Sequence, residues 1–245
     1  RAGHDITILN RGKTEARLPS GIARLTCDRT DLAALKSTLA GRDWDCVYDI
    51  SAYRPEDVAT MVKILEGHTG HYVFASSTVI YATSDLLPIS EDHPVERGES
   101  QNSYGGNKLL CEDILLQAWR ERGFPASIVA FSMVFGPHNI IPEREQRMFM
   151  RLKAGRTVMV PGDGHTVGQV GHVNDEARAL RAMMQKSATF GRRYNLTGAD
   201  CFTDNGYVDT FAEVINKPDI ELRVSILLFC RLEVPVEGLL GVFPN

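Results

Sequence analysis

The stretch Ser103-Tyr104-Gly105-Gly106-Asn107-Lys108 opens an apolar-periodic segment and carries a tyrosine and a lysine four residues apart. An α-helix has about 3.6 residues per turn, so these two side chains share one helix face. A free phenol has a pKa of about 10 and is a poor base at neutral pH unless a nearby cation favours the phenolate. The spacing indicates a tyrosine acid/base with Lys108 as its cation. A chance pair on an amphipathic helix is the alternative.

A second stretch, Phe74-Ala75-Ser76-Ser77-Thr78, precedes the tyrosine. It ends a short apolar run, His71 to Ala75, that is typical of a buried strand. Ser77 then lies at the carboxyl end of the strand, where its hydroxyl projects toward Tyr104. Together the two stretches predict one site built from a strand end and a helix.

Strands and helices alternate around these motifs. The predicted strands are Asp5 to Leu9, Ile22 to Leu25, Asp45 to Ile50, His71 to Ala75 and Ala126 to Phe131, and the predicted helices are Leu32 to Leu39, Pro55 to Glu66 and the segment from Tyr104 to the Gly123 stop. Such alternation predicts an α/β fold with a Rossmann-like, doubly wound parallel sheet.

The pattern changes after Gly136-Pro137. A helix is predicted at Met148 to Lys153, a strand at Thr157 to Val160, a helix through Met184, a strand at Arg193 to Leu196 and a helix at Asn205 to Ile215. We therefore predict a dinucleotide-binding domain at residues 1–135 and a smaller substrate lobe at residues 136–245, interleaved with returning sheet elements at about residues 170–197.

With these motifs in place, the chain resembles the extended short-chain dehydrogenase/reductase family, the NAD-dependent epimerases and dehydratases of nucleotide sugars. The resemblance covers about residues 1–218, and its carriers are Ser76-Ser77-Thr78-Val79-Ile80-Tyr81, Tyr104-Gly105-Gly106-Asn107-Lys108, Phe135-Gly136-Pro137, Pro161-Gly162-Asp163-Gly164 and Gly171-His172-Val173-Asn174-Asp175. It implies that Ser77 polarises the substrate oxygen and that Tyr104 is the general acid/base. Lys108 would lower the pKa of Tyr104 and hold the nicotinamide ribose.

The resemblance also implies a set of cofactor contacts at Asn10, Arg11, Asp28, Arg29, Asp49, Ile50, Ser51, Ser76 and Phe131. Folds that prefer NAD usually place an acidic residue after the second strand, whereas an arginine there accommodates the 2′-phosphate of NADP. Asn10-Arg11 occupies that place, so NAD(P) is expected with a preference for NADP. Arg11 as a solvated loop residue, and Asp28 as a helix cap or turn residue, are the alternatives.

The chain departs from the family pattern at its start. The family's first strand and its Gly-x-x-Gly-x-x-Gly turn, whose amides cradle the pyrophosphate, are expected just before Arg1 and are not among residues 1–245. We therefore expect an N-terminally truncated member that binds dinucleotide weakly or not at all as written. Met133 stands where many relatives have an asparagine that contacts the sugar nucleotide, which argues against that contact here.

The composition limits the classes of binding partner that we expect. A net charge of −4 argues against nucleic acid as the main partner, and the five scattered cysteines fit reduced thiols in a cytoplasm. Neither a metal site nor a membrane-spanning segment is expected. The substrate expected from the resemblance is a sugar or nucleotide sugar, and a homodimer is expected because relatives dimerise through the tyrosine-bearing helix. The alternative function is a non-catalytic binding or regulatory protein, or an inactive fragment, that kept the fold.

Overall fold

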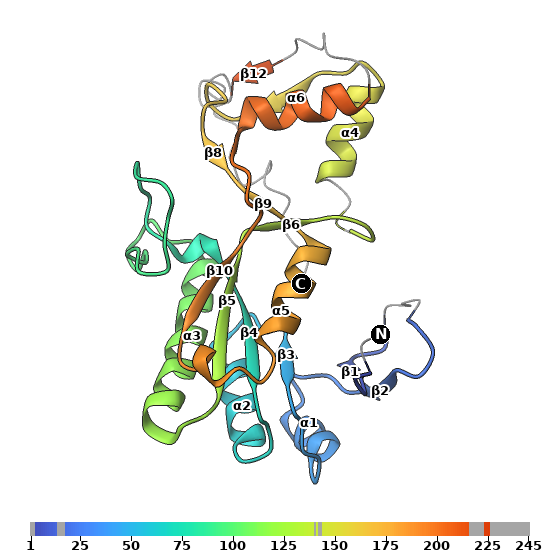
Figure 1. Cartoon of the computed structure of the whole chain (residues 1–245), viewed down its shortest axis with the longest axis vertical. Coiled ribbons are helices and arrows are strands. Elements are labelled where there is room, and N and C mark those ends of the chain that lie inside the picture. The colour runs from blue at the N-terminus through green and yellow to red at the C-terminus, as the bar shows by residue number, and fades with distance from the viewer. Residues whose placement is uncertain (1–2, 14–17, 140, 142–143, 216–222, 226–245) are drawn as a thin grey trace. The chain divides into compact units, whose positions relative to one another are not determined.

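The computed structural model describes residues 3–13, 18–139, 141, 144–215 and 223–225 (Figure 1). The chain divides into two units: Arg1–Ser132 with Arg178–Leu196, and Met133–Ala177 with Thr197–Asn245. We call them the first and second unit. The apolar segment Val234 to Phe243, and Cys230 among the five cysteines, lie outside the described residues.

The first unit is built on a four-stranded parallel sheet in the order β10-β5-β4-β3. Its strands are β3 (Val47–Asp49), β4 (Tyr72–Ser77), β5 (Ala126–Phe131) and β10 (Arg193–Leu196). The first five residues of β4 and of β5 are all buried, as expected of central strands covered on both faces. In this register Ser77 ends β4 beside Phe131, the last residue of β5.

Helices cover both faces of this sheet. α2 (Pro55–Leu65) and α3 (Ser103–Arg122) pack on one face, where their apolar residues share a core with Tyr72, Phe74 and Ile128. Val47 points to that core, so its neighbour Tyr48 points to the other face. There the Tyr48 hydroxyl donates to the Leu180 carbonyl of α5 (Val173–Met183) at 3.0 Å. The predicted doubly wound α/β fold is confirmed.

Local signals fix the ends of these helices. Pro55 begins α2 in the first-turn position that tolerates proline. The Asn102 side chain caps α3 by accepting from the Gly105 amide at 2.8 Å. Gly123 ends α3 with a φ of 67°, a left-handed conformation that glycine adopts without steric cost. The start of α3 is therefore set one residue before Tyr104.

The amino-terminal strands form a separate parallel pair, β1 (Thr7–Asn10) with β2 (Ala23–Thr26). The helix that follows is α1 (Leu32–Leu39), which Asp31 caps. In the strand order 3-2-1-4 of dinucleotide-binding folds, β1 and β2 correspond to strands two and three, and β3 to strand four. Among the described residues, the pair β1-β2 is thus separate from the four-stranded sheet at the place where the resemblance puts the family's first strand.

The second unit has its own small core of Leu152, Val158, Val160 and Val208. It contains the parallel pair β6 (Met133–Phe135) and β9 (Val170–His172), the antiparallel pair β8 (Val167–Gly168) and β11 (Phe202–Thr203), and the parallel pair β7 (Val158–Val160) and β12 (Arg223–Ser225). Its helices are α4 (Glu145–Lys153) and α6 (Asp204–Val214). Two 3₁₀ turns, η1 (Thr78–Ile80) and η2 (Ser187–Thr189), belong to the first unit.

Candidate functional site

The predicted site residues Ser77, Tyr104 and Lys108 come together in the first unit at the carboxyl edge of the sheet. Ser77 ends β4 and caps η1, with its Oγ accepting from the Val79 amide at 3.4 Å. Tyr104 and Lys108 lie four residues apart in the first two turns of α3. The hydrogen-bonding influence of the Ser77 hydroxyl lowers the pKa of Tyr104, which places the two side chains close together. Strand end and helix start therefore supply one polar cluster.

Lys108 is held rigidly although it is charged. Its side chain is only 2% exposed, and its Nζ donates to the carbonyls of Ala52 at 2.8 Å and Ala75 at 2.6 Å. Those carbonyls follow β3 and lie in β4, so the ammonium bridges two strand ends. Burial lowers the pKa of Lys108 from its usual value, and neighbouring groups including Asp49 oppose that shift.

Three aromatic rings surround the same ammonium. Nζ lies 4.8 Å from the ring centroid of Phe74, 4.9 Å from that of Tyr53 and 5.6 Å from that of Tyr104. A cation over an aromatic face is attracted by the ring quadrupole. These rings and the two carbonyls stabilise a buried charge that makes no hydrogen bond to a carboxylate within the described residues.

Tyr104 is accessible, with 41% of its surface exposed. Burial of the phenol raises its pKa above the usual value, the Ser77 hydrogen bond lowers it, and Tyr53 raises it further. The sequence predicted that Lys108 lowers the pKa of Tyr104. In the chain alone the net shift of the Tyr104 pKa is upward, because burial outweighs the hydrogen bond and the ammonium is directed to carbonyls.

Tyr53 is a site residue that the sequence motifs did not identify. Its ring centroid lies 6.0 Å from that of Tyr104, and the side chain is 55% exposed. The available signal was its position three residues after Ile50, at the end of a predicted strand. With Ile50, which is 54% exposed, Tyr53 presents apolar surface beside the phenol.

Arg29 and Asp49, predicted as cofactor contacts, bind each other. The Arg29 guanidinium donates from two nitrogens to the two Asp49 oxygens at 2.8 Å, and also to Ser51 Oγ at 3.0 Å. Asp49 further accepts from the Tyr72 hydroxyl at 2.6 Å and from the Ala52 amide at 3.1 Å. Burial would raise the pKa of Asp49, but Arg29 holds it below the usual range. The Asp49 carboxylate therefore organises the end of β3.

The predicted adenosine contacts lie in two turns. Asn10 ends β1 and accepts from the Gly12 amide at 2.9 Å, and Arg11 is exposed. Asp28 accepts from the amide and hydroxyl of Thr30 at 3.0 and 2.8 Å. Asp28 is thus a turn residue and Asp31 is the cap of α1. Neither arrangement tests whether Arg11 or Asp28 meets a cofactor.

Ser76 and Phe131 complete the predicted set. Ser76 is 4% exposed, and its hydroxyl donates to the buried carboxylate of Glu112. Phe131 is half-buried at the end of β5. The Ser76 hydroxyl therefore makes its hydrogen bond inside the protein, whereas the neighbouring Ser77 contributes its hydroxyl to the site.

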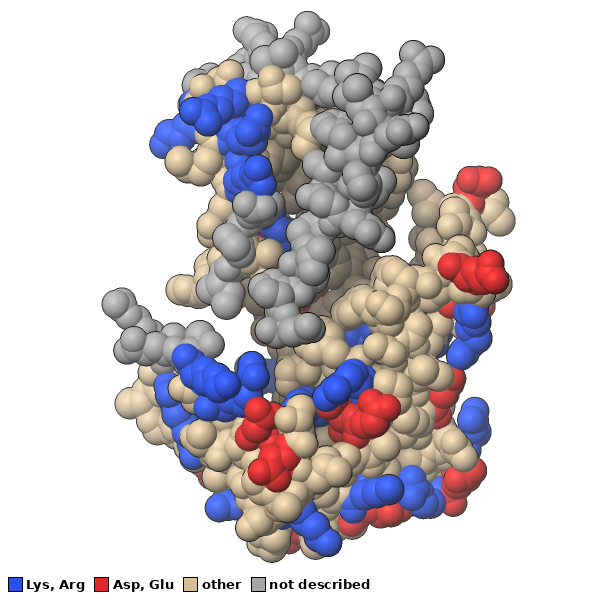
Figure 2. All heavy atoms as spheres, turned by 180° about the vertical axis from the view of Figure 1, so that it is seen from behind, with Lys and Arg blue, Asp and Glu red and all other residues tan. Residues whose placement is uncertain are grey.

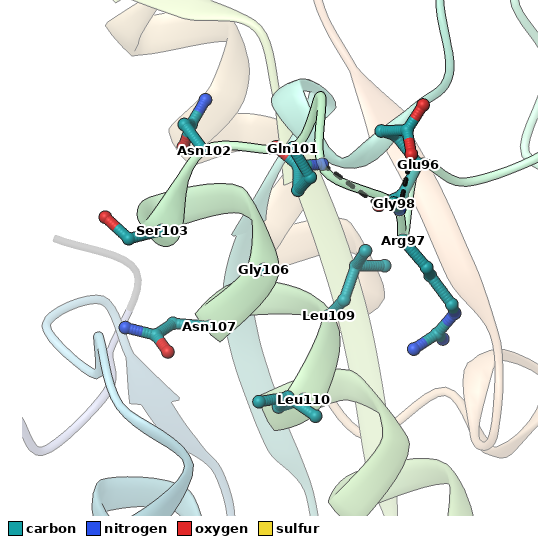
Figure 3. Close-up of a pocket in the computed structure, with 10 residues that line it drawn as sticks. All are labelled: Glu96, Arg97, Gly98, Gln101, Asn102, Ser103, Gly106, Asn107, Leu109 and Leu110. Carbon is teal, nitrogen blue, oxygen red and sulfur yellow. Dashed lines mark hydrogen bonds between the residues drawn. The ribbon is translucent and has the colours of Figure 1, made fainter.

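A pocket of about 320 Å³ lies on a different part of α3 (Figure 3). Its lining comes from the loop before the helix and from the first turns of the helix: Glu96, Arg97, Gly98, Gln101, Asn102, Ser103, Gly106, Asn107, Leu109 and Leu110. None of Ser77, Tyr104 and Lys108 contributes to this lining. Gly106, which has no side chain to fill the space, lines the pocket instead of facing the predicted chemistry.

Two general properties of the described residues bear on function. No helix in the described ranges is long and apolar enough to span a membrane. Within the same ranges, no group of three His, Cys, Asp or Glu residues is arranged to hold a metal ion.

Comparison with known sequences identifies relatives of this chain. A chloroplast stem-loop binding protein of 41 kDa from Arabidopsis thaliana is 29% identical over 91% of this chain and 60% of its own length. The 2′-dehydrokanamycin reductase of Streptomyces kanamyceticus is 23% identical over 78% of this chain and 54% of its own length. The UDP-glucose 4-epimerase of Corynebacterium glutamicum is 24% identical over 88% of this chain and 74% of its own length. The chain thus spans less than two thirds of the first two proteins.

Solved structures share the fold. The UDP-glucose 4-epimerase of Thermotoga maritima superposes with a TM-score of 0.77 at 16% identity, over 91% of this chain and 78% of its own. The dTDP-glucose 4,6-dehydratase of Streptomyces venezuelae, solved with NAD bound, superposes with a TM-score of 0.75 at 16% identity, over 90% of this chain and 75% of its own. The family model described as NAD dependent epimerase/dehydratase family matches residues 1–197. This match confirms the resemblance that the motifs predicted: the chain belongs to the NAD-dependent epimerase/dehydratase family.

Proposed function

We propose that the chain is an NAD(P)-dependent oxidoreductase of the epimerase/dehydratase type that acts on a sugar or nucleotide sugar through Ser77, Tyr104 and Lys108. The observation that carries the proposal is the convergence of these three side chains at one sheet edge. An exposed phenol whose pKa a nearby serine lowers, beside a buried lysine, is an arrangement suited to moving a proton at a substrate oxygen.

The three residues would have separate tasks. A nicotinamide, when bound, supplies hydride transfer, which requires a proton to leave or join the adjacent oxygen. Tyr104 holds or moves that proton, and Ser77 orients the same oxygen. Lys108 has three protons, of which two go to the carbonyls of Ala52 and Ala75. The third makes no hydrogen bond among the described residues, and we expect it to bind a ribose hydroxyl.

The described residues fit a dinucleotide in part. The nicotinamide end of the dinucleotide would meet three suitable features. These are the third proton on Lys108 Nζ, the exposed Tyr104, and the apolar surface of Ile50 and Tyr53. Arg11, exposed after β1, suits a 2′-phosphate and supports the preference for NADP. The pyrophosphate would need backbone amides that a Gly-rich turn supplies, and residues 1–245 contain no such turn.

The domain roles follow from the same proposal. Residues 1–135 would bind the dinucleotide and residues 136–245 would contribute to the substrate site, with a cytoplasmic location and a homodimer still expected. Relatives named UDP-glucose 4-epimerase and dTDP-glucose 4,6-dehydratase support a nucleotide sugar as the substrate class. Met133, 42% exposed, offers no hydrogen bond to such a ligand.

Turnover of the purified chain tests the function. UDP-glucose and dTDP-glucose are supplied with NAD or NADP at concentrations high enough for a weak site, and product is measured by chromatography. We expect Tyr104→Phe to abolish turnover while binding is largely kept, because the substitution removes only the hydroxyl. The half-buried Tyr194, whose hydroxyl donates to the Ala188 carbonyl, provides a matched Tyr→Phe control. Turnover that survives Tyr104→Phe would refute the acid/base role.

A second candidate function is binding of an RNA stem-loop, which the name of the Arabidopsis relative suggests. A feature that favours it is the segment of residues 144–156, which carries five Lys and Arg against one Glu in a chain of net charge −4. Figure 2 shows these blue side chains gathered over α4 without red neighbours in that view. Clustered positive charge of this kind attracts phosphate backbones.

Charge reversal distinguishes this candidate. Lys153→Glu with Arg156→Glu reverses two exposed charges of the basic segment, and Lys36→Glu with Lys63→Glu makes the same charge change on the first unit. RNA stem-loop binding through the segment predicts salt-dependent affinity that only the first pair weakens, by about tenfold or more. Equal weakening by both pairs would indicate general electrostatic attraction instead.

A further inference from the structure

The helix face that carries Tyr104 and Lys108 continues to a third ionisable residue, Glu112. The three lie at successive intervals of four residues in α3, so they are stacked on one face. Glu112 is fully buried, and burial raises the pKa of its carboxyl against the lowering influence of Arg193 and Ser76. The proposed acid/base chemistry does not use this carboxylate.

The hydrogen bonds of the Glu112 carboxylate within the described residues go to strands of the sheet. One oxygen accepts from the Ser76 hydroxyl near the end of β4, and the other accepts from Nε of Arg193 at 2.8 Å and from its Nη2. Arg193 begins β10, which lies two strands from β4. A buried carboxylate needs such a counter-charge, so the pair ties α3 to both strands.

Arg193 extends these contacts to the loop that follows Ser77 and η1. Its guanidinium lies 5.7 Å from the ring centroid of Tyr81, and the Tyr81 hydroxyl donates to Asn195 Oδ1 at 2.6 Å. Asn195 in turn donates from its amide to a Glu91 carboxylate oxygen at 2.8 Å. The four residues between Ser76 and Tyr81 are thus fixed at both ends by one polar network.

We propose that the Glu112–Arg193 pair is a positioning element of the Ser77–Tyr104 site: it holds Ser76 on one side of Ser77 and Tyr81 on the other, and so fixes the serine hydroxyl against the phenol. This inference rests on the proposed function. Glu112 does not touch the reacting atoms in this arrangement and acts through Ser76. An ion pair that only stabilises the fold is the competing explanation.

A double-mutant cycle on turnover separates the two explanations. Positioning through Ser76 predicts that Glu112→Gln and Ser76→Ala each lower kcat by about 10-fold to 100-fold with KM changed less than about threefold, since small displacements at a site have effects of this size. The double variant is expected to be no slower than Glu112→Gln, because both changes break one connection. Additive losses of kcat, or an unchanged kcat in the folded single variants, would overturn the proposal.

The chain offers a matched control at the next residue. Asp113 forms an exposed ion pair with Arg97, at 2.9 Å for both hydrogen bonds, which joins the same helix to the loop before it. Asp113→Asn removes one negative charge from α3, as Glu112→Gln does, and is expected to leave kcat within about twofold, because exposed pairs contribute little. A loss of kcat in Asp113→Asn equal to that in Glu112→Gln would contradict a specific role for Glu112.

Hydrogen exchange tests the proposal without turnover. Amides between Ser76 and Tyr81 should exchange at least about tenfold faster in Ser76→Ala and Glu112→Gln than in the parent chain, and at parent rates in Asp113→Asn. If Glu112→Gln does not fold, Ser76→Ala carries the test, because it leaves the ion pair in place. Unchanged exchange in Ser76→Ala would overturn the proposal. A parent chain without turnover but with this exchange pattern would instead contradict the proposed function alone.

Discussion

The buried His71 lies next to the amino end of β4, the strand whose other end carries Ser77, and predicts a measurable pH dependence of stability. Its Nε2 faces Ser127 Oγ at 2.8 Å, and its Nδ1 accepts from the Gln185 amide at 3.1 Å. Nδ1 is therefore unprotonated and Nε2 carries the hydrogen. The Ser127 hydroxyl donates onward to the Thr189 carbonyl at 2.8 Å. Protonating His71 would break the Gln185 contact.

Burial lowers the pKa of His71 from 6.5 to about 4 in the folded chain. Because the unfolded chain binds the proton first, the stability that the neutral imidazole contributes is fully present above pH 6.5. It is lost as the pH falls from about 6.5 to about 4, below which both states are protonated. A difference of about 2.5 pH units at about 1.4 kcal/mol each predicts a total loss of about 3.5 kcal/mol, of which roughly 3 kcal/mol is reached at pH 4.

Urea unfolding of the parent chain and of His71→Gln between pH 4 and pH 8 isolates this effect, since all other groups titrate in both proteins. We expect the parent to be the more stable at pH 8 and its advantage to shrink by roughly 3 kcal/mol at pH 4. His68→Gln is the matched control, because His68 is exposed beside Asp43. An advantage of His71 that stays constant across this range would refute the reasoning.

Three further substitutions test separate parts of the structure. Asp49→Asn should lower the free energy of unfolding by about 3 kcal/mol in urea titrations, because it removes the carboxylate that binds two nitrogens of the half-buried Arg29 guanidinium and leaves the more distant Asp57, 3.8 Å from Nε; a loss below about 1 kcal/mol would contradict this. Gly155→Ala at φ 67°, with nothing within 4 Å of the new Cβ, should cost about 1 kcal/mol. Gly191→Ala at φ 70° should cost at least about 1 kcal/mol more, because its Cβ would overlap the Trp119 ring. Equal losses of thermal stability in the two alanine variants would contradict the close contact. Tyr53→Leu removes a ring 4.9 Å from the lysine ammonium and should weaken cofactor binding by about twofold to fivefold in calorimetric titration, with folding unchanged; unchanged affinity would exclude Tyr53 from the site.

Local signals allowed much of the first unit to be predicted. α1, β5 and β10 occupy the predicted ranges Leu32–Leu39, Ala126–Phe131 and Arg193–Leu196. Pro55 marks the start of α2, Asn102 the start of α3 and Gly123 its end, and each of these signals involves only a few neighbouring residues. These signals need no information about distant parts of the chain.

The second unit shows where local signals fail. The strands β6, β8, β9 and β11 have two or three residues each and were not predicted as strands, because strands this short show no periodicity and form only through their partners. α4 begins at Glu145, three residues before the predicted start, and the preceding Arg144 makes no side-chain cap. The sequence therefore held no start signal for this helix.

Some features of the candidate site could be predicted from the sequence, and others could not. The spacing of Tyr104 and Lys108 could be predicted because it follows from helix geometry. Backbone carbonyl acceptors have no sequence signature, so the hydrogen bonds of Lys108 could not be predicted. The Arg29–Asp49 pair spans 20 residues and the Glu112–Arg193 pair spans 81. Only the folded sheet brings these residues together.

The most direct test of the Ser77, Tyr104 and Lys108 site is reduction of bound nicotinamide in a single turnover. The chain is saturated with oxidised NAD or NADP and mixed with a sugar nucleotide, and reduced nicotinamide is followed by its near-ultraviolet absorbance. We predict reduction in the parent chain, loss of about 100-fold or more in rate in Tyr104→Phe, and a smaller loss in Ser77→Ala. Reduction at the parent rate in Tyr104→Phe, with cofactor bound, would contradict the proposed site.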